Sequence, residues 1–440
     1  MKENNVKKII TGLLFSVLVA SLLGCVTPSG EIKPEQKIAT KALWESDGAV
    51  DKIVVVSDIH LGVDDSFSED VENRALFMEF LQRVEITSDI RELVIAGDFL
   101  DEWYLPLSYA KYKDSSSLYR QVIKTNQMVI DQLNDLMDTG IKVVYVVGNH
   151  DMTLDKDILS QAMPKLIQAY DAKGLGAYVT GDRNEIVIEH GHRYDVFSAP
   201  DTVTNRELCQ NDDTLFPPGY FFARIATSWI MQGKPPIKKN YPVVTAIPDP
   251  KTNPDQYGAY LYYRVLETQF LKITPIELFE DPVFDLNIGG FNDKYSLKDF
   301  YPAQQEDKTI SSPVLFKDFQ RSWDERQEIN QIQVKNSFIQ AVSGTFDSNY
   351  FFNQAKAQYL ENPQQNIDVV VFGHTHVPVF QKLDNDKYYV NDGTWIDHNN
   401  IIPSATRTFA VITTGNTDQA ALYKYMEDGS LQDLSVTANK

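Results

Sequence analysis

Six of the seven histidines of this 440-residue chain lie in four short strings, and this clustering constrains the fold and its chemistry more than any other feature. The strings are Ser57-Asp58-Ile59-His60, Gly148-Asn149-His150-Asp151, His190-Gly191-His192 and Gly373-His374-Thr375-His376. Gly97-Asp98 adds a carboxylate between the first two strings. Imidazole, carboxylate and amide groups that converge from separate loops are ligands for a pair of divalent cations. The sequence therefore predicts a two-metal site.

A short apolar run rich in valine and isoleucine precedes each of these motifs. Runs of this length and composition are typical of buried strands. They cover Lys52–Ser57, Glu92–Ala96, Lys142–Val147, Glu185–Glu189 and Asp368–Phe372. Helical stripes are expected at Glu69–Glu85 and Ser117–Met137. Strands that alternate with helices predict an α/β fold with a parallel sheet, whose strand ends then carry the ligands.

In order and residue type, the motifs resemble those of the calcineurin-like metallophosphoesterase superfamily, over residues 51–195 and 366–440. The resemblance implies a four-layer αββα sandwich with a large insertion. It also implies two divalent metal ions, and the mixed oxygen and nitrogen ligands admit Mn, Fe or Zn. The implied ligands of the first ion are Asp58, His60, Asp98 and His376, and those of the second are Asp98, Asn149, His190 and His374. Asp98 is the implied bridge.

The resemblance also implies a reaction, the hydrolysis of a phosphodiester, phosphomonoester or pyrophosphate by a hydroxide that bridges the two metal ions. His150 would lie beside the phosphate as a cation or general acid, with Asp151 orienting it by a hydrogen bond. His192 is assigned to the metal site through its backbone carbonyl, with a substrate contact or an ordinary surface imidazole as the alternatives. A catalytically inactive binding or scaffold protein on the same fold is the alternative from another functional class.

The N-terminus predicts export. Three lysines precede the apolar run Ile9–Leu23, which is shorter than a membrane-spanning helix and leads into Leu22-Leu23-Gly24-Cys25. This ending resembles a bacterial lipobox. It implies a signal peptide over residues 1–24, lipidation of Cys25, a tether over residues 25–50 and a membrane-anchored lipoprotein on the periplasmic or cell-surface side. An uncleaved membrane anchor or a coincidental cysteine is the alternative. Lipidation of Cys25 leaves Cys209 without an intramolecular disulfide partner.

Charge and one local motif bear on the substrate. The chain has 61 acidic and 41 basic residues and a net charge of −20, which disfavours a nucleic-acid polymer because lysine and arginine bind phosphate backbones. The stretch Gly97-Asp98-Phe99-Leu100-Asp101-Glu102-Trp103 resembles that of UDP-2,3-diacylglucosamine hydrolases. That resemblance implies a lipid-linked or nucleotide-linked phosphoester. The alternative is a role of this stretch in sheet packing. In addition, those hydrolases lack a lipobox and work at the cytoplasmic face.

The strand and helix alternation stops at residues 196–365, which are rich in proline and aromatic residues. We expect helices near Phe221–Met231, Tyr260–Phe270 and Glu325–Val342. A connection this long predicts an inserted cap or lid region over the metal site, with a peripheral decoration as the alternative. Its apolar stretch Phe216–Phe222 would form the core of the insert or hold an acyl chain. Three strands are expected in the tail, at Lys387–Val390, Thr408–Thr413 and Ala421–Tyr425.

Overall fold

The computed structural model describes residues 40–46, 48–107, 109, 112, 114–209, 214–234, 241–269, 282–286, 289–344, 347–399 and 402–435. They form two compact units. The two-sheet unit comprises the described residues up to Glu102, Leu118–His192 and the described residues from Phe351 onward. The insert unit comprises the described residues of Trp103–Ser117 and Arg193–Tyr350. The predicted signal peptide, Cys25 and residues 26–39 of the predicted tether lie outside the described residues.

The first sheet of the two-sheet unit has seven strands in the order β16-β15-β14-β1-β2-β3-β4. β1 to β4 run parallel to one another, whereas β14, β15 and β16 continue the sheet from β1 in antiparallel pairs. The bounds are β1 Lys52–Val56, β2 Ile90–Ala96, β3 Lys142–Val146, β4 Ile167–Ala169, β14 Thr408–Thr413, β15 Gln419–Tyr425 and β16 Leu431–Asp433. The carboxyl ends of β1, β2 and β3 therefore lie along one edge of the sheet.

The second sheet has five strands in the order β12-β13-β11-β6-β5. Its three central strands, β13, β11 and β6, are parallel, and its two outer strands pair with them in antiparallel fashion. The bounds are β5 Ala177–Thr180, β6 Ile186–Glu189, β11 Val369–Phe372, β12 Val379–Lys382 and β13 Tyr388–Asn391. The loops that follow β6 and β11 carry the last two histidine motifs.

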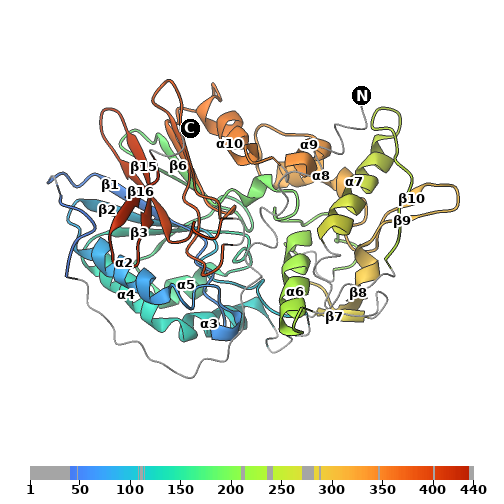
Figure 1. Cartoon of the computed structure of the whole chain (residues 1–440), viewed down its shortest axis with the longest axis horizontal. Helices are drawn as coiled ribbons and strands as arrows, with labels where there is room; N and C mark the ends of the chain where they lie inside the picture. Colours follow the sequence, from blue (N-terminus) through green and yellow to red (C-terminus); the bar gives the residue numbers. More distant parts are fainter. Residues whose placement is uncertain are drawn as a thin grey trace. The chain divides into compact units, whose positions relative to one another are not determined.

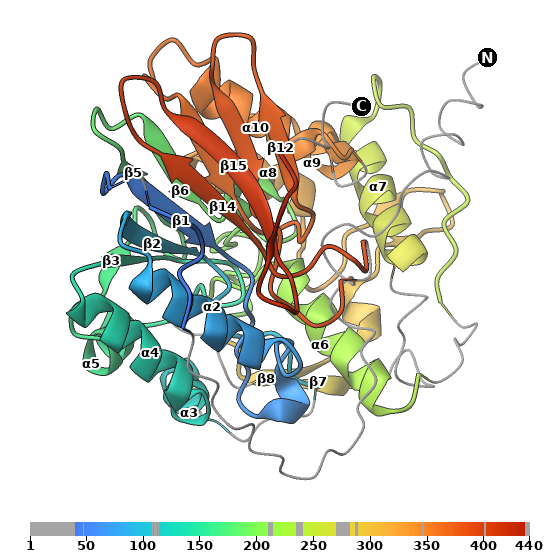
Figure 2. The same ribbon diagram turned by 60° about the vertical axis from the view of Figure 1, so that its left-hand side comes forward.

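The two sheets share one apolar core. Fully buried side chains of the first sheet, such as Val55 and Val94, belong to the same cluster as Ile188 and Val371 of the second. Helices α2 (Arg74–Ile86) and α4 (Gln127–Asp138) lie side by side against the first sheet, near α3 (Ser115–Thr125) and α5 (Lys156–Ala162) (Figure 2). Helix α10 (Tyr350–Ala355) and the π-helix Lys356–Leu360 accompany the second sheet, where Phe352 and Tyr389 have ring centroids 5.5 Å apart. This arrangement confirms the predicted sandwich.

Two of the predicted helices have different bounds in the structure. The helix expected from Glu69 begins at Arg74, because the Asp397 carboxylate accepts the backbone N–H groups of Glu72 and Asn73 and ends the preceding loop. The helix expected over Ser117–Met137 is divided into α3 and α4 at Asn126. The Asn126 side chain donates to the carbonyl oxygens of Gly62 and Val122, which holds the chain at the break.

The segment just before β1 is packed on the two-sheet unit, although it lies within the predicted tether. Leu43 is buried and its N–H donates to the Thr87 hydroxyl at 2.9 Å. The Trp44 indole donates to Asp89 at 2.9 Å. None of the helices in the described part of the chain combines the length and apolarity needed to cross a membrane.

The insert unit is built from short helices and two small two-stranded sheets around an aromatic core (Figure 1). Its elements are α6 Pro218–Met231, α7 Pro254–Gln269, β7 Pro282–Leu286, β8 Asp293–Ser296, β9 Ala303–Gln304, β10 Ile310–Ser311, α8 Phe319–Ile329 and α9 Phe338–Gly344, with a 3-10 turn at Leu297–Phe300. The helix expected over Glu325–Val342 is split, because Gln331 has a left-handed backbone (φ 58°) between α8 and α9.

The aromatic stretch of α6 forms the core of the insert unit, as the first of the two sequence-based interpretations predicts. Phe221 is fully buried, and its ring contacts those of Phe284, Phe300 and Phe316 with centroids 5.1–6.0 Å apart. Phe216 stacks on Tyr220 at 3.8 Å. These aromatic side chains pack against one another.

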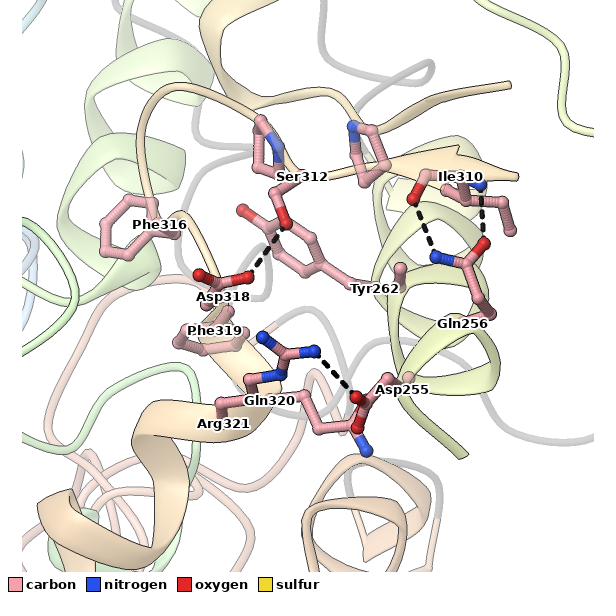
Figure 3. A pocket seen from close by; sticks show the side chains of 14 residues that line it. Asp255, Gln256, Tyr262, Ile310, Ser312, Phe316, Asp318, Phe319, Gln320 and Arg321 are labelled. Atoms are coloured by element: carbon pink, nitrogen blue, oxygen red, sulfur yellow. Dashed lines mark hydrogen bonds and ion pairs between the residues drawn. The ribbon is translucent and has the colours of Figure 1, made fainter. Parts of the chain in front are cut away.

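A pocket of about 80 Å³ lies between α7, β10 and the start of α8 (Figure 3). Several of its polar side chains are paired within the wall. Arg321 pairs with Asp255 at 2.7 Å, and the Ser312 hydroxyl donates to Asp318 at 3.2 Å. Gln256 exchanges two hydrogen bonds with the backbone of Ile310. The Tyr262 hydroxyl and Oε1 of Gln320 also line the pocket, and they are buried with no hydrogen-bond partner within the described residues.

Candidate metal centre

The predicted ligands of the two-sheet unit come together at the carboxyl ends of parallel strands. Asp58 follows β1, Asp98 follows β2 and Asn149 follows β3, while His190 and His374 follow β6 and β11 of the second sheet. Parallel strands bring these ends to the same edge, so side chains that are hundreds of residues apart become neighbours. All the predicted ligands are buried.

Five of these residues have a left-handed backbone, which residues other than glycine rarely adopt. They are Asp58 (φ 53°), His60 (φ 54°), Asp98 (φ 50°), His374 (φ 71°) and His376 (φ 56°). Each such conformation costs on the order of 1–3 kcal/mol and persists only where the surrounding fold enforces it. Concentrated strain of this kind is a feature of functional sites, and here it coincides with the residues that the sequence assigns to metal binding.

The first ligand group consists of Asp58, His60 and His376. The Nε2 atoms of the two histidines lie 3.2 Å apart, and Nε2 of His376 lies 3.0 Å from Oδ1 of Asp58. His60 directs its Nδ1 at the Asp101 carboxylate at 2.7 Å, so Nδ1 carries a proton and Nε2 is the atom left for a second proton or a metal. Within the described part of the chain, Oδ1 of Asp58 has no hydrogen-bond donor. Acceptor atoms therefore face one another, an arrangement that a cation relieves.

The second group repeats this pattern around His190. Its Nδ1 donates to the Ala96 carbonyl oxygen at 2.8 Å, so Nε2 is again the atom left for a proton or a metal. Nε2 lies 3.0 Å from Oδ1 of Asn149 and 3.2 Å from Oδ2 of Asp98. The ring of His374 lies 5.1 Å from that of His190.

Asp98 lies between the two groups. Its Oδ2 is 3.7 Å from Nε2 of His60 and 3.2 Å from Nε2 of His190. Gly148 is required beside it, because a Cβ at that position would overlap with the Asp98 carboxylate. A ligand atom shared by the two groups is what the sequence predicts for a bridge, and the bridging itself stays a prediction.

The electrostatics of the site favour positive charge. Burial acts to raise the pKa of Asp98, but His190 and His150 beside it hold this pKa well below its usual range. Burial acts to lower the pKa of His190, but Asp98 and Asp58 raise it to about 9. A proton on His190 satisfies the surrounding acceptors, and a divalent cation would take its place and release it. The donor set, its burial and its charge fit divalent metal ions.

Ser57 and Asp392, to which the sequence analysis assigns no role, help to hold the Asp58 carboxylate. Its Oδ2 accepts from the backbone N–H of His374 at 2.9 Å and from the hydroxyl of Ser57. The Ser57 oxygen also lies 2.6 Å from Oδ1 of Asp392. One hydroxyl proton cannot serve two carboxylates, and burial raises the pKa of Asp392 well above its usual range. Burial therefore favours the protonated form of Asp392, which can donate to Ser57 while Ser57 donates to Asp58.

His150 is oriented by Asp101, and the role predicted for Asp151 was wrong. Nδ1 of His150 lies 2.8 Å from Oδ2 of Asp101. Asp151 instead accepts from the backbone N–H groups of Gly148 at 2.6 Å and Phe99 at 2.8 Å, so it fixes two loops rather than an imidazole. The sequence signal for Asp101 was its place three residues after Asp98 in the quoted stretch. Burial acts to lower the pKa of His150, and Asp101 and Asp98 raise it above its usual value.

His192 is buried next to the second ligand group. Its Nε2 donates to the Gly174 carbonyl oxygen at 3.0 Å, and its Nδ1 has no hydrogen-bond partner within the described residues. Its ring lies 5.3 Å from that of His190 and 6.3 Å from that of His374. The surface-imidazole alternative is excluded by this burial, whereas the backbone-ligand role stays a prediction.

Comparison with known families is consistent with this geometry. Residues 51–228 match the profile described as calcineurin-like phosphoesterase. The match includes the first four metal-site motifs and ends in the insert, so the His374 and His376 string lies beyond it. A comparison with curated proteins found no match.

Three solved structures illustrate how distant the similarity of the whole chain is. Vacuolar protein sorting 29 from Cryptosporidium parvum has 11% identity and a TM-score of 0.31, covering 87% of this chain and 95% of its own. A dimetal phosphatase from Danio rerio has 10% identity and a TM-score of 0.34, covering 85% and 95%. Phosphopantetheinyl hydrolase from Mycobacterium tuberculosis has 13% identity and a TM-score of 0.24, covering 78% and 89%. At these values no function is transferred from them.

Proposed function

We propose that this chain hydrolyses a phosphoester, a phosphodiester, phosphomonoester or pyrophosphate, with the help of two divalent cations. The observation that carries the proposal is the convergence of five strained, buried ligand residues from both sheets on two neighbouring groups of acceptor atoms. A fold that had kept its shape but lost catalysis would have no need to sustain this strain. The complete ligand set therefore favours an enzyme over the inactive scaffold.

The proposed division of ligands follows the two groups. Asp58, His60 and His376 would hold one ion, Asn149, His190 and His374 the other, and Asp98 both. Two cations bound by these residues would lower the pKa of a bound water molecule, which would serve as the nucleophile, and would neutralise charge on the phosphoryl oxygens. Which of Mn, Fe and Zn is bound would depend on the availability of each metal as much as on the types of ligand.

His150 has a different task in this proposal. Because its Nδ1–H donates to Asp101, its Nε2 is the atom that faces a substrate. The raised pKa of His150 favours the protonated ring, which can donate a proton to the leaving oxygen or stabilise charge on the phosphoryl group. Asp101 keeps the ring in the required tautomer and orientation.

We further propose that the enzyme is an exported lipoprotein anchored through Cys25, which would place it at a membrane surface. A lipid-linked or nucleotide-linked phosphoester is then the substrate class that fits the resemblance of Gly97–Trp103. A nucleic-acid polymer is disfavoured by the net charge of −20.

The direct test is hydrolysis of bis(p-nitrophenyl) phosphate and p-nitrophenyl phosphate by the purified chain after loading with Mn²⁺, Fe²⁺ or Zn²⁺. We expect turnover that is lost after chelation and restored by at least one of the three ions. A protein that binds two ions per chain yet hydrolyses neither compound, nor any member of a broad phosphoester panel, would support the scaffold alternative.

A further inference from the structure

Two consecutive residues of the loop after β2, Asp101 and Glu102, form hydrogen bonds with His150. Asp101 contacts the imidazole, with its Oδ2 2.8 Å from Nδ1. Glu102 contacts the backbone, because its N–H donates to the His150 carbonyl oxygen at 3.0 Å. The contact with Asp101 restricts rotation of the imidazole about its side-chain torsions, and the contact with Glu102 fixes the backbone from which the ring projects.

The Glu102 carboxylate in turn joins two further elements. It is 1% exposed and accepts from the Tyr119 hydroxyl at 3.0 Å and from the Thr153 hydroxyl. The Tyr119 hydroxyl also lies 3.3 Å from the His150 carbonyl oxygen. Tyr119 comes from α3, and Thr153 lies three residues after His150 in the loop that follows β3.

The energetics make this arrangement rigid. A hydrogen bond to a buried carboxylate is stronger than one between neutral groups, and a buried carboxylate that loses a donor keeps its desolvation penalty. Moving the His150 loop would break the bonds of Glu102 to both the His150 backbone and Thr153. Glu102 is thus hydrogen-bonded to the loop at both His150 and Thr153, and Tyr119 of α3 donates a further hydrogen bond to the Glu102 carboxylate.

We propose that Glu102, Tyr119 and Thr153 form a positioning network that sets the direction of the His150 imidazole. The kinetic consequence rests on the proposed function, whereas the orientation itself does not. Glu102 and Tyr119 contact the His150 backbone, and Thr153 contacts Glu102, so the three are positioning residues rather than catalytic ones. The network also gives Glu102 a role within the Gly97–Trp103 stretch that metal binding does not explain.

Removal of single hydroxyl groups tests the network with little change in shape. We expect Tyr119→Phe and Thr153→Val each to lower kcat about tenfold on an alkyl phosphodiester, where the leaving group needs a proton, and less on a nitrophenyl ester. KM and metal content should stay unchanged. Thr153→Ser keeps the hydroxyl and should retain wild-type kcat, which separates the hydrogen bond from packing.

Tyr388→Phe is the matched control. Tyr388 is a buried tyrosine of the same unit, and its hydroxyl donates to Gln419 at 3.0 Å between β13 and β15. This variant should lose a comparable amount of stability in urea unfolding without changing kcat. An equal fall in kcat for Tyr388→Phe and Tyr119→Phe would overturn the network, because the loss would then follow stability alone.

A readout without activity uses histidine labelled with ¹³C and ¹⁵N in the metal-free protein. The His150 ring signal is identified by its disappearance in His150→Ala. Tyr119→Phe and Thr153→Val should displace this signal, whereas Thr153→Ser and Tyr388→Phe should leave it in place. An undisturbed His150 signal in Tyr119→Phe and Thr153→Val would overturn the inference even if the protein is an active phosphoesterase. A displaced signal in a protein that hydrolyses no phosphoester would keep the network and reject the proposed function.

Discussion

His60 and His150 direct their Nδ1 atoms at the same carboxylate oxygen, Oδ2 of Asp101, at 2.7 and 2.8 Å. Their rings meet edge to face with centroids 4.5 Å apart. Burial acts to raise the pKa of Asp101, but the two imidazoles hold it well below its usual range, so the oxygen accepts from both rings. One carboxylate thereby fixes the tautomer of a proposed metal ligand and of the proposed general acid.

Asp101→Asn is therefore expected to affect two properties at once. An amide keeps one acceptor oxygen but loses the charge, and its NH₂ group repels a ring N–H. We expect affinity at the first metal site to fall about 10- to 100-fold and kcat at saturating metal to remain reduced. Metal titration and steady-state kinetics measure the two effects separately. A variant impaired in only one of them would show that the shared oxygen serves a single histidine.

Much of this site was predictable because its residues follow strands that have a clear sequence pattern. Valine-rich runs identify β1, β2, β3, β6 and β11, and parallel strands bring their ends together. The choice of the partner for His150 was not predictable in this way. Asp151 is adjacent in sequence, but its side chain turns toward backbone N–H groups, whereas Asp101 comes from another loop.

The misplaced helix bounds have a similar origin. The apolar stripe that predicts α2 continues back to Val71, but the start of the helix is decided by Asp397, more than three hundred residues away. The insert lacks a periodic pattern, since its core forms from aromatic side chains on many short elements. Long-range partners of this kind are absent from local sequence periodicity.

Asp98 is the residue whose loss should affect both ions. Asp98→Ala removes the only side chain proposed to contact both of them, so we expect one ion per chain at most and loss of hydrolysis. Metal analysis after desalting, together with activity assays, provides the measurement. Asp135→Ala on the exposed face of α4 is a control for the change in residue type. Two tightly bound ions and near-normal turnover in Asp98→Ala would refute its role as the bridge.

His150 should behave differently from the ligand histidines. His150→Ala is expected to lower kcat by about 10²–10⁴ with both metals bound, and added metal should give no recovery. His190→Ala and His374→Ala should lose occupancy of the second ion, and excess metal should partly restore them. A good leaving group such as nitrophenolate should reduce the defect of His150→Ala if it acts as a general acid. Loss of metal from His150→Ala would contradict the assignment.

Lipidation of Cys25 predicts a separation of anchoring from chemistry. Cys25→Ser should release the protein from membranes, and its specific activity should match that of the detergent-solubilised wild-type protein. Fractionation followed by an alkaline wash of the membrane pellet measures the first property. Persistence of Cys25→Ser in the washed pellet would point to an uncleaved signal segment or a second anchor.

Glu69 makes the stability of the metal-free protein depend on pH. Its two carboxylate oxygens are buried and have no hydrogen-bond donor among the described residues, and Nδ1 of His60 lies 3.6 Å from one of them. Burial raises the pKa of Glu69 from 4.5 to about 7, although His60 acts to lower it. A raised pKa means that the folded protein binds the proton more tightly than the unfolded chain does. The associated stability is therefore complete below pH 4.5 and is lost as the pH rises to about 7.

Glu69→Gln removes this titration while keeping the size of the side chain. Between pH 5 and pH 8, the metal-free wild-type protein should lose about 2 kcal/mol of unfolding free energy relative to Glu69→Gln. Urea unfolding of both proteins in a chelating buffer at the two pH values gives this difference, and comparison within each pH cancels the contribution of other titrating groups. A difference in stability between the two proteins that is the same at pH 5 and pH 8 would mean that Glu69 titrates at its ordinary pKa. If the wild-type protein were instead less stable relative to Glu69→Gln at pH 5 than at pH 8, the folded-state pKa of Glu69 would be lowered rather than raised. A salt bridge between ionised Glu69 and His60 would then have to be stronger than the effect of burial.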